Sequence, residues 1–277
     1  MHDATGTAFA SFEQKWLDAH PENALVAVFL PVEQRRRERA FNTLVHELEQ
    51  AAFDVREPQI AAAKLAWWQH ELVEASTGNA RHPITKTLFS DAQARAVDPA
   101  IWPAMAAGAA MMTEPVSYAT LAESLTGFTP FYCAVARAER ALLEGKTGDC
   151  SAHATLWTIT HLLRELANPS RFDARLPLDL LARHGVTRRD LTTATQLCAA
   201  LLRDYLGALT GEIHKALAVT SPASLTRRVR TCLDLFFASK AQRAADPLAY
   251  LVAHTPAGRW RSLLAAWREA RALERRR

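Results

Sequence analysis

Four acidic residues lie in LVHELEQAAFDVREP, residues 44–58, whose apolar spacing predicts a helix: Glu47, Glu49, Asp54 and Glu57. Carboxylates on one helix face can bind Mg²⁺, which prefers hard oxygen ligands and helps to activate phosphate groups. If Leu48 marks the middle of the buried stripe, a step of about 100° per residue places Glu49 and Phe53 on one flank. Glu47 and Asp54 then fall on the other flank. The acids do not converge, and the pattern favours solvated helix flanks over a metal site.

Other common catalytic signatures do not occur in the sequence. There is no Gly-rich phosphate loop, no GxSxG nucleophile motif and no HExxH zinc motif. The cysteines form no CxxC pair, which argues against a zinc knuckle or a thioredoxin-like pair and predicts small buried residues in a reducing compartment. They are Cys133, Cys150, Cys198 and Cys232. Single histidines such as His46, His70 and His161 are expected to be structural.

The elements that would position these residues are helices. Apolar residues recur at helical spacing, and no sustained alternation of β-branched residues predicts a sheet. Three glycines, Gly78, Gly145 and Gly185, follow periodic stretches and are expected to end helices. The predicted helices span 8–19, 33–56, 59–77, 84–96, 99–112, 118–126, 129–144, 150–167, 177–183, 188–217, 222–243 and 247–275, the last broken near Pro256.

The composition is that of one globular domain. Of the 277 residues, 49% are hydrophobic and 22% are charged, which provides a large core and excludes a disordered or collagenous chain. No shift in composition marks a boundary. We therefore predict a single all-α domain over residues 1–277, a large helical bundle with a central cavity, in which residues 1–20 are peripheral.

The positive charge is concentrated at the C-terminal end. Residues 259–277 hold seven arginines and two glutamates, whereas the rest of the chain has 26 basic and 27 acidic residues. A charge confined to one end argues against a nucleic-acid-binding surface on the body. Residues 268–277 are expected to form a basic flexible tail.

Several longer phrases carry a resemblance. They are VFLPVEQRRRERA at 28–40, KLAWWQHEL at 64–72, RHPITKTL at 81–88, FYCAVARAERALLEG at 131–145 and TITHLLRELANPSRFDARLPLDLLARHGVTRRDL at 158–191. In order and spacing they resemble the squalene/phytoene synthase family over about residues 20–215. The resemblance implies an isoprenoid synthase fold in which two facing helices each offer an aspartate-rich motif to Mg²⁺ and a prenyl diphosphate.

The motif positions that the resemblance implies are degraded here. The first motif falls on Glu49, Gln50 and Phe53, which leaves one carboxylate of three. The second falls on the phrase that begins at Arg164 and retains Glu165 and Asn168 before Pro169. A lone carboxylate on each helix would leave magnesium ions coordinated largely by water. We therefore expect no metal site, no confident catalytic residue and no cofactor, with Mg²⁺ required only if the chain is an enzyme.

Basic and apolar residues remain at positions where family members bind substrate. The resemblance assigns diphosphate binding to Arg36, Arg164, Arg171 and Arg175, since guanidinium matches phosphate in a bidentate geometry. A solvated arginine rim is the alternative. The aromatic pair Trp67 and Trp68 could line an isoprenoid tunnel together with Met105, Met111 and Met112, although packing into the core is favoured.

Three functions follow from this pattern. The leading interpretation is a non-catalytic isoprenoid-binding, lipid-binding or assembly protein, since the family has non-catalytic relatives that include one needed for assembly of respiratory complex I. The first alternative is a head-to-head prenyltransferase that condenses prenyl diphosphates with atypical ligands. The second alternative is a helical scaffold that binds no ligand.

The C-terminal helix bears on partners and location. Trp260, Leu263, Leu264 and Trp267 share one helical face with arginines around it, the pattern of a basic amphipathic helix. This face either docks on the body or makes weak contact with an anionic membrane. No signal segment or membrane span is evident, so we expect a cytoplasmic protein, peripheral to the inner membrane if that contact forms.

Overall fold

The computed structural model describes residues 4–114, 116–168, 176–192, 196–254 and 259–275. Within these ranges the chain forms helices and no strand, which confirms the all-α prediction. The α-helices are α1 (Ala4–Ala19), α2 (Glu22–Val26), α3 (Val32–Glu49), α4 (Pro58–Ser76), α5 (Pro83–Phe89), α6 (Ala92–Ala96), α7 (Ile101–Ala110), α8 (Leu121–Glu144), α9 (Ser151–Leu166), α10 (Leu178–His184), α11 (Gln196–Val219), α12 (Leu225–Arg243), α13 (Pro247–Ala253) and α14 (Arg259–Glu274). The 3₁₀ turns η1 (Ala27–Phe29) and η4 (Asp190–Thr192) and the π turn η2 (Gln50–Asp54) complete them.

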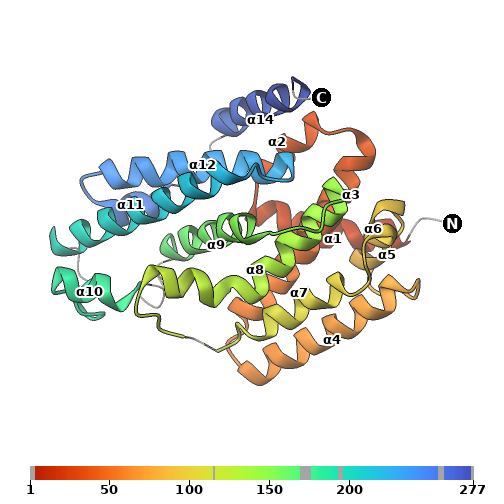
Figure 1. The fold of residues 1–277 in the computed structure, drawn as a ribbon, viewed down its shortest axis with the longest axis horizontal. Helices are drawn as coiled ribbons and strands as arrows, with labels where there is room; N and C mark the ends of the chain where they lie inside the picture. The colour runs from red at the N-terminus through yellow and green to blue at the C-terminus, as the bar shows by residue number, and fades with distance from the viewer. Residues whose placement is uncertain (1–3, 115, 169–175, 193–195, 255–258, 276–277) are drawn as a thin grey trace.

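The long helices are stacked in an order that leaves α9 near the centre. From the lower to the upper edge of Figure 1, α4, α7, α8, α9, the pair α11 and α12, and α14 follow one another. Helix α3 packs against α1, α5 and η2. Helix α1 packs on the body through Phe9 and Trp16, which are buried.

Of the residues that could line an isoprenoid tunnel, some lie in the core and some at the surface. Trp68 and Met105 are buried, with Trp102 and Phe131 among their core companions. Trp67 and Met111 are exposed instead, at 48% and 66% of their side-chain surfaces, and Met112 is half-buried. The prediction that these residues pack into the core thus holds for Trp68 and Met105 and not for Trp67 and Met111.

Helix α8 is one helix, although the sequence analysis divided it near residue 127. Pro130 lies inside it, where it removes one backbone donor. The neighbouring helix α7 approaches closely at this point: a Cβ added to Gly108 would overlap the Pro130 carbonyl oxygen and lie 2.8 Å from Phe131 Cα. Only a glycine on α7 allows this contact with the backbone of α8.

The C-terminal residues form a docked helix rather than a free tail up to Glu274. Helix α14 contacts α2 and α12 and buries Ser262, Ala265 and Ala266. Trp260 and Leu264 remain 82% and 55% exposed. Docking thus occurs, but the expectation that it would use the tryptophan face is wrong.

Among the described residues, no helix combines the length and the apolar composition needed to cross a bilayer.

The close approach of α7 and α8 makes a testable prediction. Gly108→Ala should lower the free energy of unfolding by about 1–3 kcal/mol. The added methyl group meets backbone atoms of α8, which can move away only if the helix itself shifts. Gly211→Ala on α11 is the matched control, since a Cβ there meets no atom within 4 Å. Its higher helix propensity should leave stability unchanged or raise it by about 0.5–1 kcal/mol. Urea unfolding of both variants checks this, and equal effects would contradict it.

Candidate functional site

The five predicted motif positions lie around one cavity between α3 and α9. This outer cavity has a volume of about 190 Å³. Its lining comprises His46, Glu49, Gln50, Phe53, Asp54, His161, Arg164, Glu165 and Asn168. Both motifs therefore converge as the family resemblance implied, and Arg164 lies with them.

Asp54 joins this lining because the helix changes its geometry. Residues Gln50–Asp54 form a π turn, whose i→i+5 hydrogen bonds widen the helix. Asp54 is five residues after Glu49, so the wider turn brings the two carboxylates to the same cavity. Asp54 is exposed, as expected, but it lies at the same cavity as Glu49 rather than on the opposite flank, because the expectation assumed an unbroken α-helix. Glu47, which was also expected to be solvated, is buried instead.

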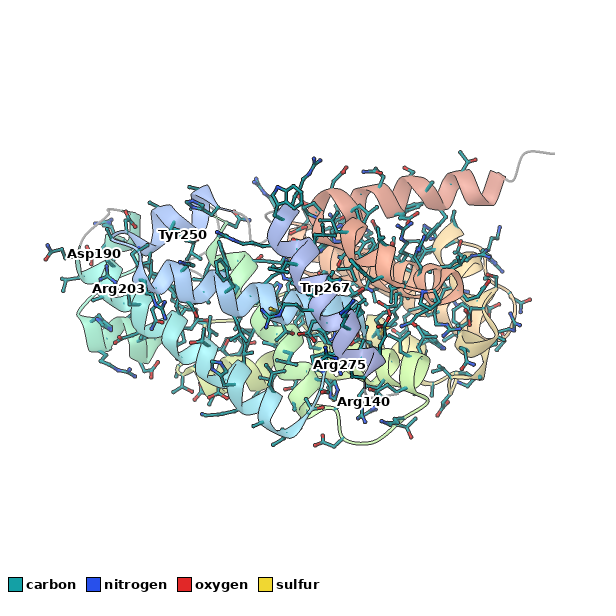
Figure 2. All side chains as sticks on the ribbon, turned by 90° about the horizontal axis from the view of Figure 1, so that it is seen from above. Arg140, Asp190, Arg203, Tyr250, Trp267 and Arg275 are labelled. Atoms are coloured by element: carbon teal, nitrogen blue, oxygen red, sulfur yellow. The ribbon has the colours of Figure 1, made fainter. Side chains whose placement is uncertain are left out.

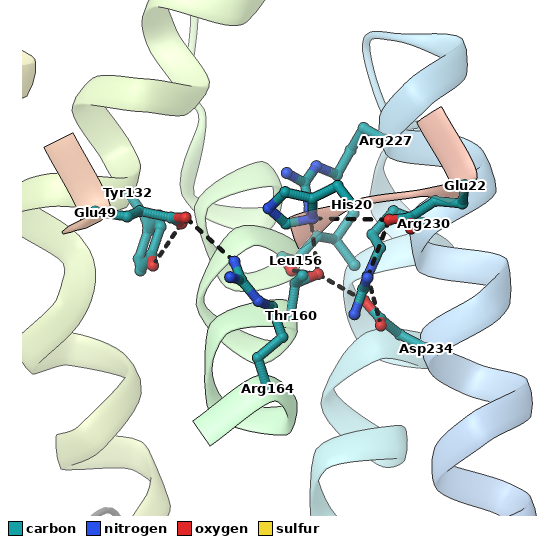
Figure 3. Close-up of polar contacts among 10 residues, drawn as sticks. All are labelled: His20, Glu22, Glu49, Tyr132, Leu156, Thr160, Arg164, Arg227, Arg230 and Asp234. Atoms are coloured by element: carbon teal, nitrogen blue, oxygen red, sulfur yellow. Dashed lines mark hydrogen bonds and ion pairs between the residues drawn. The ribbon is translucent and has the colours of Figure 1, made fainter. Parts of the chain in front are cut away.

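Glu49 is held by two side chains from other helices (Figure 3). The Tyr132 hydroxyl donates a hydrogen bond to Glu49 Oε1 at 3.0 Å, and Arg164 Nη1 lies 3.3 Å from Oε2. Burial and the charge of Glu49 raise the pKa of Tyr132 well above its usual value, so the phenol stays protonated. Both oxygens of the one carboxylate that remains in the first motif are thus already engaged.

Phe53 takes part in an aromatic cluster instead of binding a cation. Its ring centroid lies 4.2 Å from that of His161, 6.0 Å from Phe128 and 6.2 Å from Phe131. These rings fill the space beside the first motif. The donor set of this motif therefore does not fit a group of magnesium ions: Phe53 supplies no oxygen, and the positive charge beside Glu49 comes from Arg164.

A smaller inner cavity, of about 30 Å³, lies on the other side of Glu49 and Arg164. Besides these two residues its lining includes His20, Glu22, Asn23, Asn42, His46, Trp157, Thr160, Thr226, Arg227 and Arg230. The volume is enough for about two water molecules. Arg227 and Arg230 come from α12, beyond the last motif, and were not predicted. Their sequence signal was a cluster of three arginines, Arg227, Arg228 and Arg230, outside any motif.

Arg230 joins the N-terminal and C-terminal halves of the site. Its guanidinium lies 3.1 Å from Glu22 and 2.8 Å from Asp234, which also accepts a hydrogen bond of 2.6 Å from Thr160 on α9. Burial opposes the charge of Glu22, yet the neighbouring His20 and Arg230 lower its pKa to about 2. Arg227 lies 3.2 Å from the centre of the Trp157 ring and donates to Thr160.

Two histidines approach Glu49 from the inner cavity. One ligand atom from each of His20, His46 and Glu49 lies within 4.8 Å of the other two. Burial, with the charge of Arg164, lowers the pKa of His20 to about 4, and burial also lowers that of His46, so both rings are neutral at pH 7. Neutral imidazole is the form that binds metals, but Glu49 could join such a site only by giving up Arg164.

The predicted diphosphate arginines have different positions. Arg164 lines both cavities with about one third of its side chain exposed. Arg36 is exposed on α3 and is not part of either lining. Arg171 and Arg175 lie outside the described residues. Of the two that are described, Arg164 lies in the motif region and Arg36 does not.

The comparisons with known proteins agree with this geometry. The family model for squalene/phytoene synthase matches residues 18–243. The chain belongs to the squalene/phytoene synthase family. The match extends through α12, so the inner-cavity arginines lie within the family region. No curated protein matches the sequence.

Two solved structures of the family have the same overall fold. One is a dehydrosqualene synthase in complex with a ligand, with a TM-score of 0.70 and 14% identity over 98% of both chains. The other is the squalene synthase HpnC from Alicyclobacillus acidocaldarius, with a TM-score of 0.62 and 16% identity over 83% of this chain and 92% of that one. At these identities the similarity establishes the isoprenoid synthase fold of this family member and does not assign it an activity.

Glu38 lies on α3, one helical turn before Asn42 of the inner cavity, and it links α3 to α12. It accepts hydrogen bonds from Thr226 at 2.7 Å and from Gln34 at 2.9 Å. Burial raises the pKa of Glu38 to about 7 from its ordinary 4.5. The folded protein therefore holds a proton on Glu38 that the unfolded chain loses near pH 4.5.

This proton makes stability depend on pH. Because the folded-state pKa is the higher one, the contribution of Glu38 is complete below about pH 4.5 and is lost as the pH rises through about 7. Glu38→Gln cannot ionise, so its free energy of unfolding relative to wild type should rise by about 3 kcal/mol between pH 4.5 and 8. Urea unfolding across this range measures the difference. The exposed Glu33→Gln should follow wild type, and a difference that does not vary with pH would contradict the assignment.

Proposed function

We propose that this family member does not condense prenyl diphosphates and instead binds an isoprenoid or other lipid that carries a phosphate group. The observation that carries the proposal is the engagement of Glu49 by Tyr132 and Arg164. In this role the protein is a binding or assembly protein rather than an enzyme.

A guanidinium can replace only part of what a magnesium ion does at such a site. Magnesium brings two positive charges and orders oxygen ligands in an octahedron, and it activates a leaving diphosphate as a Lewis acid. Arg164 brings one permanent charge on a planar group, which neutralises Glu49 and donates hydrogen bonds but does not activate the phosphate in that way. A contact of 3.3 Å between them links α9 to α3 without a metal.

The same guanidinium favours binding of a phosphate. Arg164 faces the outer cavity, whose volume of about 190 Å³ is too small for a whole prenyl diphosphate but fits its head group. A charge-assisted hydrogen bond from Arg164 would contribute roughly 1.5–3 kcal/mol. Binding through arginine should not require a divalent ion.

One observation favours the enzymatic alternative. The π turn brings Asp54 to the cavity that Glu49, Glu165 and Asn168 also line. Together they offer three carboxylates and an amide, which are oxygen donors of the kind that magnesium prefers. A head-to-head prenyltransferase built on these residues is therefore the second candidate, with Asp54 replacing the acid absent at Phe53.

A single experiment separates these candidates. Pure protein is incubated with farnesyl or geranylgeranyl diphosphate and Mg²⁺, and the extract is assayed for C30 or C40 product. We expect no product, and the same binding of farnesyl diphosphate by calorimetry with Mg²⁺ and with a chelator. Arg164→Ala should weaken this binding about 10- to 100-fold. Arg183→Ala, an exposed arginine on α10, is the control and should leave affinity unchanged.

The outcomes point to different functions. Product that disappears on chelation and in Asp54→Asn would overturn the proposal and establish the enzyme. Affinity that needs Mg²⁺ would also contradict it. Absence of binding under all conditions would leave the ligand-free scaffold, in which side chains alone fill the interior.

We further propose that α14 brings the protein to an anionic membrane surface. Taking Ala265 and Ala266 as the buried direction, steps of about 100° per residue place Trp260, Leu264 and Trp267 within about 30° of the opposite side. Their exposed fractions of 82%, 55% and 44% agree with this outward direction. Trp267 and Arg275 lie along this outer helix in Figure 2. Arginines beside large apolar groups suit the interface between lipid head groups and acyl chains.

The membrane proposal predicts weak binding that depends on salt. Vesicles with anionic lipid should sediment the protein at low salt, since each basic residue near such a surface contributes about 1 kcal/mol, and about 1 M salt should release it. Replacing Trp260 and Trp267 by serine should reduce the bound fraction several-fold without unfolding the protein. Trp67→Ser, which alters a tryptophan of similar exposure on α4, is the matched control. Equal binding by all three proteins, or none at low salt, would refute the surface.

A further inference from the structure

Two cysteines that are distant in sequence are adjacent in the fold. Cys133 lies in the middle of α8, and Cys150 immediately precedes α9. Their sulfur atoms are 2.9 Å apart. Packed carbon atoms are separated by about 3.5–4.0 Å, and bonded sulfur atoms by about 2.05 Å, so the two thiols are closer than ordinary packing brings them. The view of all four cysteines as separate buried residues does not hold for this pair.

We propose that Cys133 and Cys150 form an oxidative modification site, at which a small-molecule disulfide such as glutathione disulfide joins them in an intramolecular disulfide. The inference requires neither a lipid nor a metal, so it is independent of the proposed function.

The connection between α8 and α9 already holds the two residues in place. It folds back along α8, where Arg140 donates to the Asp149 carbonyl oxygen and the Lys146 amide donates to the Arg140 carbonyl oxygen at 3.3 Å. Asp149 in turn accepts a hydrogen bond from the Ser151 amide at 3.0 Å, at the start of α9. Bond formation therefore needs a shift of the sulfur atoms of about 1 Å rather than movement of either helix.

The exposure of the two thiols assigns the order of the reaction. Cys133 is half-buried and can meet a dissolved oxidant, whereas Cys150 is 2% exposed. The Cys133 thiolate attacks one sulfur of glutathione disulfide, forms a mixed disulfide and releases one glutathione thiolate. Cys150, as thiolate, then attacks the Cys133 sulfur and releases the second glutathione. The two cysteines lose two electrons and two protons, and two glutathione thiols are formed.

The environment of Cys150 makes its step the slower one. Burial, and then the neighbouring Cys133, raise the pKa of the Cys150 thiol to about 11, and the Arg137 guanidinium acts in the opposite direction. The attack depends on the thiolate fraction, so the yield at fixed time should increase with pH. Neutralising Arg137 should slow closure of the mixed disulfide.

The crosslink would join the middle of α8 to the N-terminal end of α9, the end opposite to Arg164. The bond would close a loop between residues 133 and 150, which reduces the conformational entropy of the unfolded chain more than that of the folded chain. Oxidation should therefore raise the thermal midpoint.

The other two cysteines provide a matched control. Cys198 is buried and its thiol contacts the Asp190 carbonyl oxygen at 3.4 Å, whereas Cys232 is exposed on α12. In Cys198→Ser/Cys232→Ser only the proposed pair remains. In Cys133→Ser/Cys150→Ser only Cys198 and Cys232 remain.

Each double variant is incubated with glutathione disulfide at pH 8, quenched in acid, unfolded and assayed for free thiols, with the intact mass measured in parallel. We expect the number of free thiols in the first variant to fall from two to none. Its intact mass should be that of a monomer with no glutathione attached, and reduction should restore both thiols. The second should form no intramolecular disulfide, and glutathione or dimers should appear only through Cys232.

The result that would overturn the proposal is equally direct. Two free thiols in the first variant after treatment, or glutathione retained on Cys133 without closure at long times, would mean that the pair does not form the bond. A thermal midpoint that rises on oxidation in the first variant and not in the second supports the placement of the crosslink between α8 and α9, and a midpoint that falls would contradict it.

Discussion

Buried carboxylates have to be balanced inside this bundle, and that requirement determines how the central helices meet. The half-buried Glu49 is balanced by Arg164, and the buried Glu22 and Asp234 share Arg230. Removing Arg230 would leave buried charges without a partner, at a cost of about 3–5 kcal/mol. Because the partners come from α2, α3, α9 and α12, the ion pairs restrict the positions of four helices at once. The polar site is in this sense part of the scaffold.

The same balance bears on how α3 and α9 are held together. On facing helices that carry only acids, mutual repulsion would keep the acids apart unless cations joined them. Here α9 contributes a cation, Arg164, to Glu49 of α3. The aromatic cluster around Phe53 adds apolar packing beside this contact. Side chains thus join the two helices, and function has to be argued from those side chains.

Much of the architecture was predictable because it depends on local rules. The spacing of apolar residues gave the helices, and Gly78, Gly145 and Gly185 all have the positive φ expected at helix ends. What failed depended on long-range contacts. The π turn that moves Asp54 is not encoded in apolar spacing. The role of Arg227 depends on Thr160, 67 residues away in the sequence, and that of Arg230 depends on Glu22 near the N-terminus. Motif positions could be named from the sequence, whereas their partners, such as Tyr132, needed the fold.

Helix α14 shows how one amphipathic pattern can be used in two ways. Its small residues, Ser262, Ala265 and Ala266, allow close packing on α2 and α12, and the ion pair of Glu269 with Arg228 at 3.8 Å adds to this face. Burying the tryptophans instead would have removed more apolar surface from water, at about 25 cal/mol per Å². Leaving them outside is therefore unfavourable for the isolated protein. An exposed apolar surface that is bordered by arginines is suited to contact with another apolar phase, which is the contact proposed for α14.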